Sequence, residues 1–495
     1  MDLLNFLLCV VFTWTLVQGI ISITKGSKTN PSKLPPGPTP LPVIGNLLKL
    51  GSKPHKALAE LAKTHGPIMI LKLGRINTVV ISSPTMAKEV LQKQDLAFST
   101  RAPPDSLSAH NHKQVSVAWL PVSARWRSLR RICNSHIFSS QRLDANQHLR
   151  RQKVQELVAD IRESCKAGVA VNIGQAAFKT SLNLLSNTIF SMDLAEPSSD
   201  MAQELKEVVC RIMEDAGKPN LADYFPVLRK MDPQGLRRGL TIHFARIIEL
   251  LDGLINQRLE SKNIVSNDVL DTLLNIIEDQ KDGIDRTHIK HLFLDLFAAG
   301  TDTTSSTLEW SMAELLQNPK TLSKAQAELE QTIGRGNPVE ESNIARLPYL
   351  QAIVKETMRL HPPLPFLLPR KVEADVQLCG FTVPKDAQVL VNAWAIGRDP
   401  SIWVNPNLFM PERFLGSHVD VRGRDFELIP FGAGRRICPG LPLAVRMVHL
   451  MLGSLINSFN WKLEDGIGPE DMNMEDKFGL TLEKALPLRA VPIYM

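Results

Sequence analysis

The most informative segment of this chain is Pro430-Phe431-Gly432-Ala433-Gly434-Arg435-Arg436-Ile437-Cys438-Pro439-Gly440. Its single cysteine, Cys438, lies in a turn-forming loop, two residues after an arginine and just before an apolar helix predicted over 441–457. A thiolate is stabilised by backbone N–H groups, by nearby positive charge and by the N-terminus of a helix. The segment can supply all three. It therefore predicts a stabilised thiolate, with a buried structural cysteine as the alternative.

The spacing within this segment favours the first interpretation. The pattern F-x-x-G-x-R-x-C-x-G is complete in Phe431, Gly434, Arg436, Cys438 and Gly440. It resembles the haem-binding loop of the cytochrome P-450 superfamily at every position. A thiolate ligand pushes electron density onto haem iron and favours cleavage of the O–O bond. The resemblance implies that Cys438 is the axial ligand of the iron and that Phe431 and Arg436 contact the haem.

Composition excludes several other classes of protein. The 495 residues are 44% hydrophobic and 22% charged, close to globular averages, which excludes disordered, collagen-like and coiled-coil chains. The net charge of +6 is too small to indicate a nucleic-acid binder, although a basic patch for an acidic protein or a membrane surface stays open. The six cysteines include no CxxC pair, which argues against a disulfide framework and a zinc site.

The N-terminus predicts a membrane anchor over residues 1–24. Leu3–Thr24 carry no charge, and 22 helical residues would span about 33 Å, against about 30 Å for the hydrocarbon core. A cleaved signal peptide is the alternative, but it requires a basic start, and this one has Asp2 instead. Lys25 and Lys28 follow the span and predict a cytosolic downstream side. We expect a single-pass protein of the endoplasmic reticulum membrane with a cytosolic catalytic domain.

Residues 25–45 are predicted to be a basic and proline-rich hinge, followed by one domain over 46–495. Leu34–Pro42 contain five prolines in nine residues, which favours a stiff hinge over a loose linker. Helical periodicity dominates from about 141 to 330. Further elements are predicted as follows: a helix over 54–65, strands over 68–73, 78–81, 376–380 and 388–391, and an irregular stretch over 409–439.

Ala299-Gly300-Thr301-Asp302-Thr303-Thr304 lie inside a helix predicted over 285–317, with Asp285 as its cap. Glycine and threonine are poor residues for a helix interior. Packing could compensate for them, or they could distort the helix so that the Thr303 hydroxyl turns outward instead of bonding to the i−4 carbonyl. The segment is similar to the oxygen-binding helix of the superfamily. Turned outward, Thr303 would donate a hydrogen bond to dioxygen, and Asp302 would feed protons through water.

Two further motifs carry charged residues. Glu356-x-x-Arg359 lies on a helix predicted over 348–360, where such a pair is usually solvated and of small value. The resemblance implies instead a buried structural triad of Glu356, Arg359 and Arg413. Trp126 and Arg130 are four residues apart and share a helical face, which suits a haem propionate, while a solvated basic helix is the alternative.

The resemblance adds three more arginines to the propionate site, Arg101, Arg370 and Arg436. It leaves Arg125, Arg127, Arg131 and Arg435 as candidates for docking the acidic surface of a reductase. It also implies an apolar substrate pocket that Thr303 faces from the long helix. The other pocket residues would be Leu296, Ala299, Leu364, Phe366, Leu367, Leu368, Leu480 and Thr481.

Within the superfamily the chain is most similar to plant microsomal enzymes, as in Ala393–Pro400, and to the geraniol 8-hydroxylase subfamily of terpenoid hydroxylases. The stretches 87–95, 180–187 and 421–430 carry the second likeness. The resemblance covers the chain from the hinge to Pro487. It implies a mainly α fold with a smaller β-rich lobe, and haem b between the long central helix and the helix after the cysteine loop.

The activity implied is monooxygenation of a small lipophilic substrate, with a monoterpenol such as geraniol, hydroxylated at carbon 8, as the best candidate. No nucleotide-binding glycine loop is visible, so NADPH is expected to act only through a membrane-bound cytochrome P-450 reductase. Other monooxygenase substrates stay open: a diterpene, a prenylated phenol or an alkoxycoumarin. A haem-thiolate isomerase and a haem-based sensor are further alternatives, and the Asp302–Thr303 pair argues against the isomerase.

Overall fold

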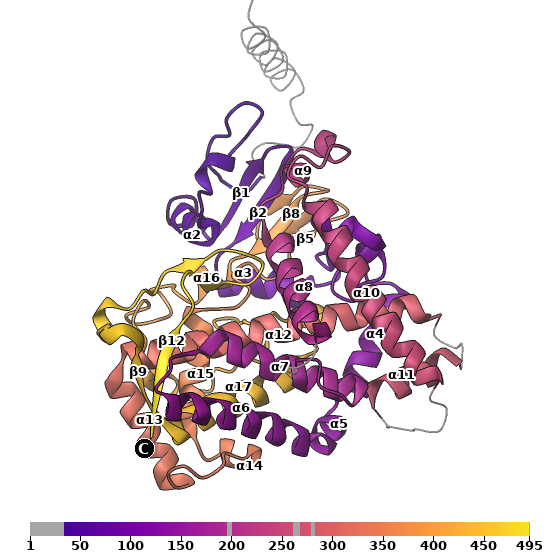
Figure 1. Cartoon of the computed structure of the whole chain (residues 1–495). Helices are drawn as coiled ribbons and strands as arrows, with labels where there is room; N and C mark the ends of the chain where they lie inside the picture. Colours follow the sequence, from indigo (N-terminus) through magenta and orange to yellow (C-terminus); the bar gives the residue numbers. More distant parts are fainter. Residues whose placement is uncertain (1–33, 196–199, 261–267, 279–282, 495) are drawn as a thin grey trace, which may run out of the picture.

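The computed structural model describes residues 34–494 apart from 196–199, 261–267 and 279–282. Helices form most of the described chain, and a smaller lobe built around the N-terminal strands lies at one end (Figure 1). The predicted fold class, mainly α with a smaller β-rich lobe, is confirmed. The predicted anchor over residues 1–24 lies outside the described residues.

The helices keep the order that the sequence periodicity indicates. The longer ones within the described ranges are α2 (Pro54–His65), α4 (Ala124–Ile132), α6 (Gln147–Ala167), α7 (Ile173–Phe190), α8 (Asp200–Gly217), α10 (Leu236–Glu260), α11 (Val269–Glu278), α12 (Arg286–Gln317), α13 (Pro319–Thr332), α15 (Pro348–Leu360) and α17 (Leu441–Ser458). The shorter ones are α3 (Pro84–Lys88), α5 (Ser140–Ala145), α9 (Leu221–Tyr224), α14 (Glu341–Ile344) and α16 (Ala393–Ile396).

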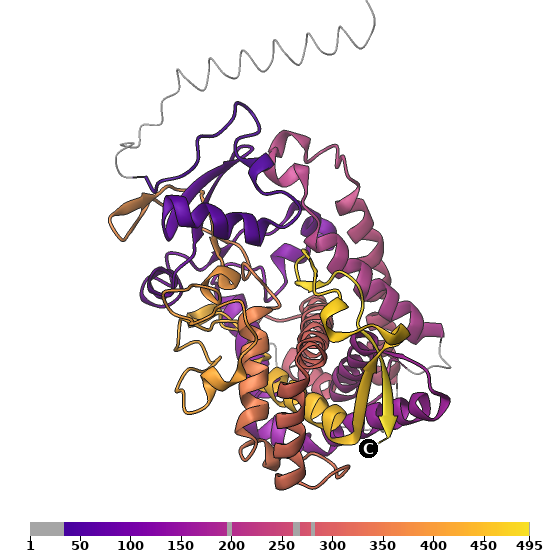
Figure 2. The ribbon, with the colours of Figure 1, turned by 90° about the vertical axis from the view of Figure 1, so that its left-hand side faces the viewer.

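The main sheet joins distant parts of the chain. Its strand order is β1 (Ile68–Leu73), β2 (Ile76–Ile81), β8 (Gln388–Val391), β5 (Arg370–Lys371) and β3 (Thr100–Arg101), and only the β2–β8 pair is parallel. Figure 2 shows the orange segment that contains β8 beside the indigo N-terminal strands. The pairing of β3 with β5 sets Arg101 directly opposite Arg370.

Three smaller sheets complete the strands. One contains β4 (Val171–Asn172), β12 (Arg489–Tyr494) and β9 (Phe459–Leu463), and two hairpins pair β6 (Val376–Leu378) with β7 (Phe381–Val383) and β10 (Asp476–Lys477) with β11 (Glu483–Lys484). The strand predicted over 376–380 is thus shorter and turns back on itself, because Cys379 and Gly380 both have positive φ, as a tight turn requires.

The described end of the hinge packs on the sheet. The Ile70 N–H donates to the Pro36 carbonyl at 2.9 Å, and Gly45 pairs with Leu73 as an isolated bridge. A Cβ atom on Gly37 would lie 1.9 Å from the Ile70 carbonyl oxygen, so only glycine allows this approach. The proline-rich segment covers β1, the outer strand of the sheet, and its stiffness is reinforced by that contact.

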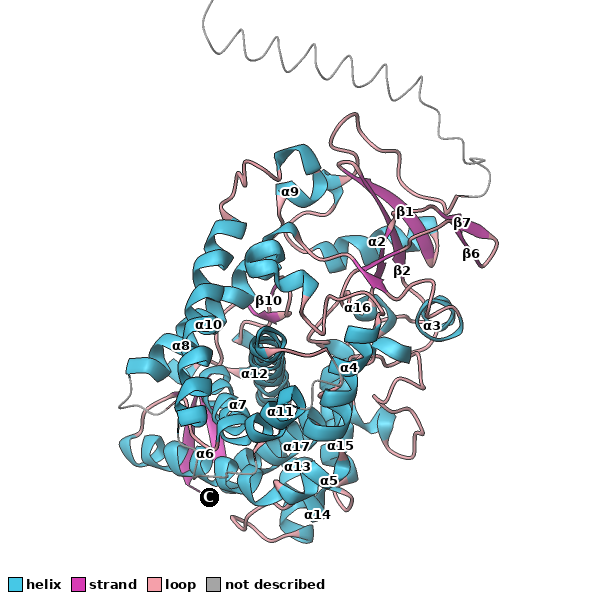
Figure 3. Ribbon diagram, turned by 90° about the vertical axis from the view of Figure 1, so that its right-hand side faces the viewer, coloured by secondary structure: helices cyan, strands magenta, loops and turns pink. Residues whose placement is uncertain are grey.

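Helix α12 runs through the centre of the molecule, where Figure 3 shows it end-on among the other helices. Asp285 caps its start as predicted, and His288 completes a capping box. The predicted distortion around Gly300 is wrong, because the helix is continuous from Arg286 to Gln317. A Cβ atom on Gly300 would lie 2.8 Å from Leu185 of α7, so the glycine serves close helix packing.

Helix α17 begins directly after the cysteine loop, with Gly440 as its cap residue. Within the described part of the chain it is the one helix long and apolar enough to cross a membrane, but 61% of that stretch is buried inside the protein. This burial identifies it as a core helix. The irregular stretch predicted over 409–439 contains only two short 3-10 turns, Pro411–Phe414 and Gly434–Arg436.

Candidate functional site

The cysteine loop holds Cys438 at the start of α17. The Cys438 N–H donates to the Phe431 carbonyl at 3.0 Å, which closes the loop. Burial raises the pKa of the Cys438 thiol, and the backbone N–H groups of Gly440 and Leu441 together with the positive charge of Arg130 oppose that shift. The donors that stabilise a thiolate are therefore in place around the sulfur.

The glycines of the loop are needed for its shape. Gly432 and Gly434 both have positive φ, 69° and 68°. A Cβ atom on Gly434 would lie 1.8 Å from the Leu91 carbonyl oxygen. The loop can therefore pack on the short helix Glu89–Lys93 only because residue 434 is glycine. Phe431 is half-buried and packs against the main core cluster.

Four arginines converge beside this loop. Arg101, Arg370 and Arg436 are buried, and Arg130 is half-buried. Burial and repulsion from the other three lower the pKa of Arg101 well below its usual value, and burial first of all lowers the pKa of Arg370 to about 10 and of Arg436 to about 9. Like charges in such a group destabilise the protein unless an anion lies between them.

The partners of these arginines within the described chain are backbone carbonyls. Arg101 donates to Leu368, Arg370 to Phe98, Arg436 to Ser99 and Leu120, and Arg130 to Ile437. The Nε atoms of Arg101 and Arg370 and Nη1 of Arg436 are buried with no partner among the described residues. The group therefore has buried, charged N–H donors without partners among the described residues, which suits a ligand with carboxylates.

Trp126 lies among these arginines, but the hydrogen-bond partner of its N–H is not the predicted one. Trp126 is buried, and the Arg436 guanidinium stacks over its ring at 4.5 Å from the centroid. Its Nε1–H donates to the Val117 carbonyl at 3.1 Å, so in this structure it does not point to a propionate site. The nearby carbonyl satisfies the indole within the protein, a contact that sequence spacing could not reveal.

The middle of α12 contains two of the residues predicted for the site, Ala299 and Thr303. Ala299 is exposed although its helix is buried on most sides, and Thr303 is half-buried. The Thr303 hydroxyl donates to the Ala299 carbonyl at 2.6 Å, as Thr301 and Thr304 do to their own i−4 carbonyls. The expected outward orientation of Thr303 is therefore not the one observed, because the helix itself supplies an acceptor.

Asp302 lies beside the C-terminal hairpin formed by β10 and β11. Its Oδ2 atom is buried with no hydrogen-bond partner among the described residues. Burial raises the pKa of the carboxyl, and Thr481, Glu483 and Lys477 oppose the shift. The structure brings Asp302 and Thr481 together from the predicted site, and it adds Glu483, which the sequence did not indicate.

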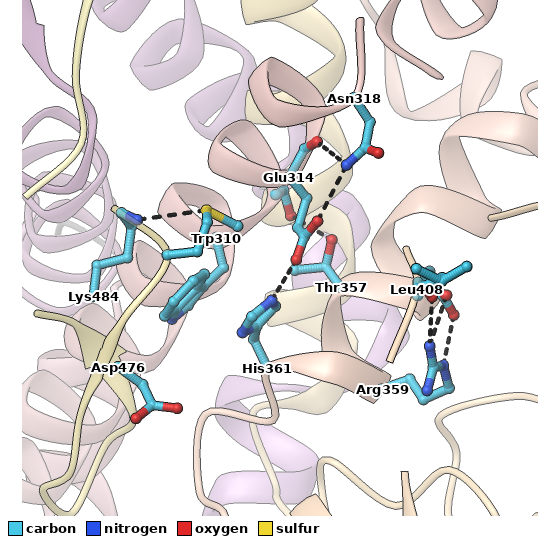
Figure 4. Close-up of polar contacts among 12 residues, drawn as sticks. Trp310, Glu314, Asn318, Thr357, Arg359, His361, Leu408, Asp476 and Lys484 are labelled. Atoms are coloured by element: carbon cyan, nitrogen blue, oxygen red, sulfur yellow. Dashed lines mark hydrogen bonds and ion pairs between the residues drawn. The ribbon is translucent and has the colours of Figure 1, made fainter. Parts of the chain in front are cut away.

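The three residues of the predicted triad meet, as the resemblance implied. Glu356 accepts two hydrogen bonds from Arg359, at 2.7 and 2.8 Å, and one from Arg413 at 3.0 Å. Glu356 and Arg359 are fully buried. Arg359 also donates to the carbonyls of Pro406 and Leu408, so it ties α15 to the segment just before the irregular stretch (Figure 4). The solvated-pair interpretation is therefore wrong for this motif.

The predicted pocket residues fall into separate groups. Leu296, Leu368 and Leu480 belong to one apolar cluster, so the structure brings these three together. Leu367 packs instead with the β-sheet cluster and lies near Gly432. Phe366 packs against Phe478 and the N-terminal lobe, and Leu364 is half-buried and belongs to none of these clusters. Sequence order alone could not separate neighbours that point in different directions.

A polar contact on the loop before α4 was not indicated by the sequence. His112 Nδ1 lies 2.9 Å from His291 Nδ1, and its Nε2 lies 3.2 Å from Asp295 of α12. Burial, and then the charge of His112, lower the pKa of His291 to about 4. Asp295 also accepts from Ser116 at 2.8 Å. These contacts fix the loop over 105–114 to α12 next to Leu296.

The surface arginines lie as the helical period dictates. Arg125, Arg127 and Arg131 are exposed on the outer face of α4, while Trp126 and Arg130 face inward. Arg435 is exposed as well, but its guanidinium pairs with Asp95, at 3.1 Å. Part of its charge is therefore neutralised within the protein.

A cysteine at a helix N-terminus, beside buried arginines that lack carboxylate partners in the described chain, is the donor set of a haem-thiolate protein. The chain belongs to the cytochrome P450 family, which residues 35–487 match. It is an oxidoreductase, a monooxygenase whose cofactor is haem, with electrons from NADPH supplied through a reductase.

Its similarity to characterised relatives extends over the full chain. It is 61% identical to a geraniol 8-hydroxylase of Catharanthus roseus, over 99% of both chains. It is 60% identical to a geraniol 8-hydroxylase of Swertia mussotii, again over 99% of both. A drimenol monooxygenase of Persicaria hydropiper is 54% identical, over 99% of this chain and 97% of the relative.

The triad generates a prediction about stability. Glu356→Gln keeps the shape of the side chain but leaves two guanidinium groups facing a neutral amide in a buried site. Loss of one partner of a buried pair costs about 3–5 kcal/mol. We expect the free energy of unfolding, measured by urea denaturation of the holoenzyme, to fall by this amount, and haem to be released at lower urea concentrations.

Glu60→Gln is the matched control, because the Glu60–Lys63 pair also joins residues three apart on a helix but is 69% and 71% exposed. It should leave the urea midpoint and haem retention unchanged. Equal midpoints for the Glu356→Gln variant and the wild type would contradict a structural role of the triad.

Proposed function

We propose that the protein hydroxylates a monoterpenol, with geraniol and its carbon 8 as the best candidates. The observation that carries this proposal is the full-length similarity to two geraniol 8-hydroxylases. The apolar cluster of Leu296, Leu368 and Leu480 supports it, because a small neutral lipophilic molecule suits such a surface.

The residues proposed to hold haem come from four segments: β3, α4, β5 and the cysteine loop with the start of α17. Cys438 is the axial ligand, and its thiolate is stabilised by the Gly440 and Leu441 N–H groups. The haem propionates are proposed to bind between Arg101, Arg130, Arg370 and Arg436, with Trp126 placing the Arg436 guanidinium by stacking. Phe431, whose carbonyl accepts from the Cys438 N–H, is proposed to contact the haem beside the cysteine.

Haem bound in this way supplies the oxygen chemistry: dioxygen, two electrons and two protons become one water molecule and one oxygen atom inserted into a C–H bond of the substrate. Thr303 and Asp302 are proposed to handle the protons. The Thr303 oxygen donates its own proton to the Ala299 carbonyl, so its lone pairs are free to accept a hydrogen bond from water. Asp302, one residue before, is proposed to supply protons to that water.

The site of action is proposed to be the endoplasmic reticulum membrane, with a cytosolic catalytic domain held by residues 1–24. The uncharged stretch Leu3–Thr24 supports the anchor. The exposed Arg125, Arg127 and Arg131 are proposed to contact the acidic surface of a cytochrome P-450 reductase.

The substrate assignment is tested by turnover. Microsomes that contain this protein and a plant reductase should convert geraniol to 8-hydroxygeraniol with NADPH, as measured by gas chromatography and mass spectrometry. The same screen should include a prenylated phenol and 7-ethoxycoumarin. Exclusive turnover of either of these, with no product from geraniol, would overturn the monoterpenol proposal but leave the monooxygenase class intact.

The axial ligand is tested by spectroscopy. Cys438→His replaces the thiolate with a neutral imidazole, so the red-shifted band of the reduced carbon-monoxide complex should disappear. Cys165→Ser removes a half-buried cysteine of α6 and should keep the band. A band retained in the Cys438→His protein would contradict the ligand assignment.

The proton roles are tested by the coupling of NADPH use to product. Thr303→Ala should still consume NADPH, but peroxide should replace much of the hydroxylated product. The rate of product formation should fall by up to about 10²-fold where no ordered water compensates. Asp302→Asn keeps the size of the side chain but cannot release a proton, so oxygen consumption itself should slow. Wild-type coupling in Thr303→Ala would contradict its part in proton delivery.

A further inference from the structure

One face of α12 lies along the last hairpin of the chain. Asp302, Ser306 and Trp310 follow at intervals of four residues, which places them on the same face. Ser306 Oγ and Trp310 Nε1 both donate to the Leu482 carbonyl, at 2.9 and 3.2 Å. Figure 4 shows Lys484, two residues further, next to Trp310. Asp302 therefore lies where this contact begins, one turn before Ser306.

Two carboxyl groups meet at that point. Asp302 and Glu483 lie close enough for each to shift the pKa of the other, and Thr481 lies beside them. Oδ2 of Asp302 and Oγ1 of Thr481 are buried with no hydrogen-bond partner among the described residues. Two ionised carboxylates this close in a buried site repel each other, so a single proton shared between them stabilises the contact.

The charges around the pair favour the protonated state. Burial, followed by the charge of Asp302, raises the pKa of Glu483 to about 7, and Glu309 acts in the same direction. Lys477 is the cation that faces both carboxyls, and it lowers the pKa of each. It does not offset the burial of the pair.

Glu483 connects this buried contact to solvent. Its side chain is half-buried, and its cross-strand neighbour in the β10–β11 pair, Lys477, is exposed. The Asp302 carboxyl lies beside the β10–β11 hairpin. Thr303, the next residue of α12, donates its hydroxyl to the carbonyl of the exposed Ala299. The order from solvent to the site is thus Glu483, Asp302, Thr303.

We propose that Glu483 is the positioning residue that shares a proton with Asp302 and supplies it from solvent. The proposal rests on the proton-relay role proposed above for Asp302. In the step, the single proton of the pair passes from Glu483 to Asp302, so the O–H bond of Glu483 breaks as an O–H bond forms on Asp302, and Asp302 then releases that proton toward the water held by Thr303. Glu483 then takes a proton from hydronium or a buffer acid, so the pair returns to its starting charge.

The test compares kcat for NADPH-dependent oxygen consumption in microsomes that contain the full-length enzyme and reductase. Glu483→Gln should lower kcat about tenfold while KM for the substrate stays the same, a smaller loss than removal of a direct proton donor because Asp302 remains. The wild-type kcat should fall above about pH 7, where Glu483 loses its proton, and the variant should lack this decline. Glu483→Asp should restore part of the rate.

The effects of the Asp302 and Glu483 substitutions on kcat should not be additive. The double variant Asp302→Asn with Glu483→Gln should be no slower than Asp302→Asn alone, because both changes interrupt one path. Glu475→Gln is the matched control, since this carboxylate lies in the same C-terminal region but is 64% exposed and pairs with Lys53. It should keep the wild-type rate and pH profile.

Infrared spectroscopy of the purified holoenzyme gives a readout that does not depend on turnover. The C=O stretch of a protonated carboxylic acid should be present at pH 6, decline as the pH rises through about 7, and be absent from the Glu483→Gln difference spectrum. An unchanged carbon-monoxide band verifies that each variant is folded.

The two proposals fail in different ways. If Asp302→Asn slows oxygen consumption but Glu483→Gln alters neither kcat, the pH profile nor the carboxylic-acid band, the shared proton is wrong and the relay role of Asp302 stands. If Asp302→Asn itself leaves oxygen consumption unchanged, the relay role fails and the supply path fails with it.

Discussion

Four guanidinium groups gathered without a carboxylate partner in the described chain are the constraint on which the rest of this structure depends. Arg101 and Arg370 face each other across two paired strands, a position where like charges destabilise a sheet. Arg436 and Arg130 add two more charges from the cysteine loop and α4. Burial lowers the pKa values of all four groups, and repulsion from the other arginines adds to this for Arg101 and Arg436, so the fold holds positive charge that a bound anion would stabilise.

This requirement explains why such distant segments meet. The β2–β8 pairing brings residues 370–391 to the N-terminal lobe, and the fit of Gly434 against Leu91 brings the cysteine loop to the same lobe. The triad around Glu356 fixes the irregular stretch from the other side. Chemistry and folding are therefore coupled here: the groups proposed to bind the haem carboxylates are also the groups that destabilise the protein without them.

The sequence predicted those parts of the molecule that depend on local pattern. The bounds of α2, α15, β1 and β8 agree with the expectation, and Asp285 caps α12 as predicted, because periodicity, prolines and capping residues act over a few positions. The meeting of Glu356, Arg359 and Arg413 was implied by resemblance and not by spacing.

The sequence could not predict those features that depend on contacts between distant residues. Gly300 and the threonines of α12 indicated a distorted helix, but Leu185 of α7 and the i−4 carbonyls compensate for them. The Trp126 N–H donates to the Val117 carbonyl. Asp302 lies beside Glu483, a residue 181 positions later with no motif around it. Local pattern cannot show which partner a buried polar group finds.

In this structure the arginine group is proposed to require the two carboxylates of haem. The most direct measurement compares the thermal midpoint of the apoprotein with that of the protein reconstituted with haem or with haem whose two propionates are methyl esters. Because a ligand that binds only the folded state stabilises it in proportion to its affinity, haem should raise the midpoint strongly and the diester should raise it far less. Equal stabilisation by haem and its diester would contradict the account.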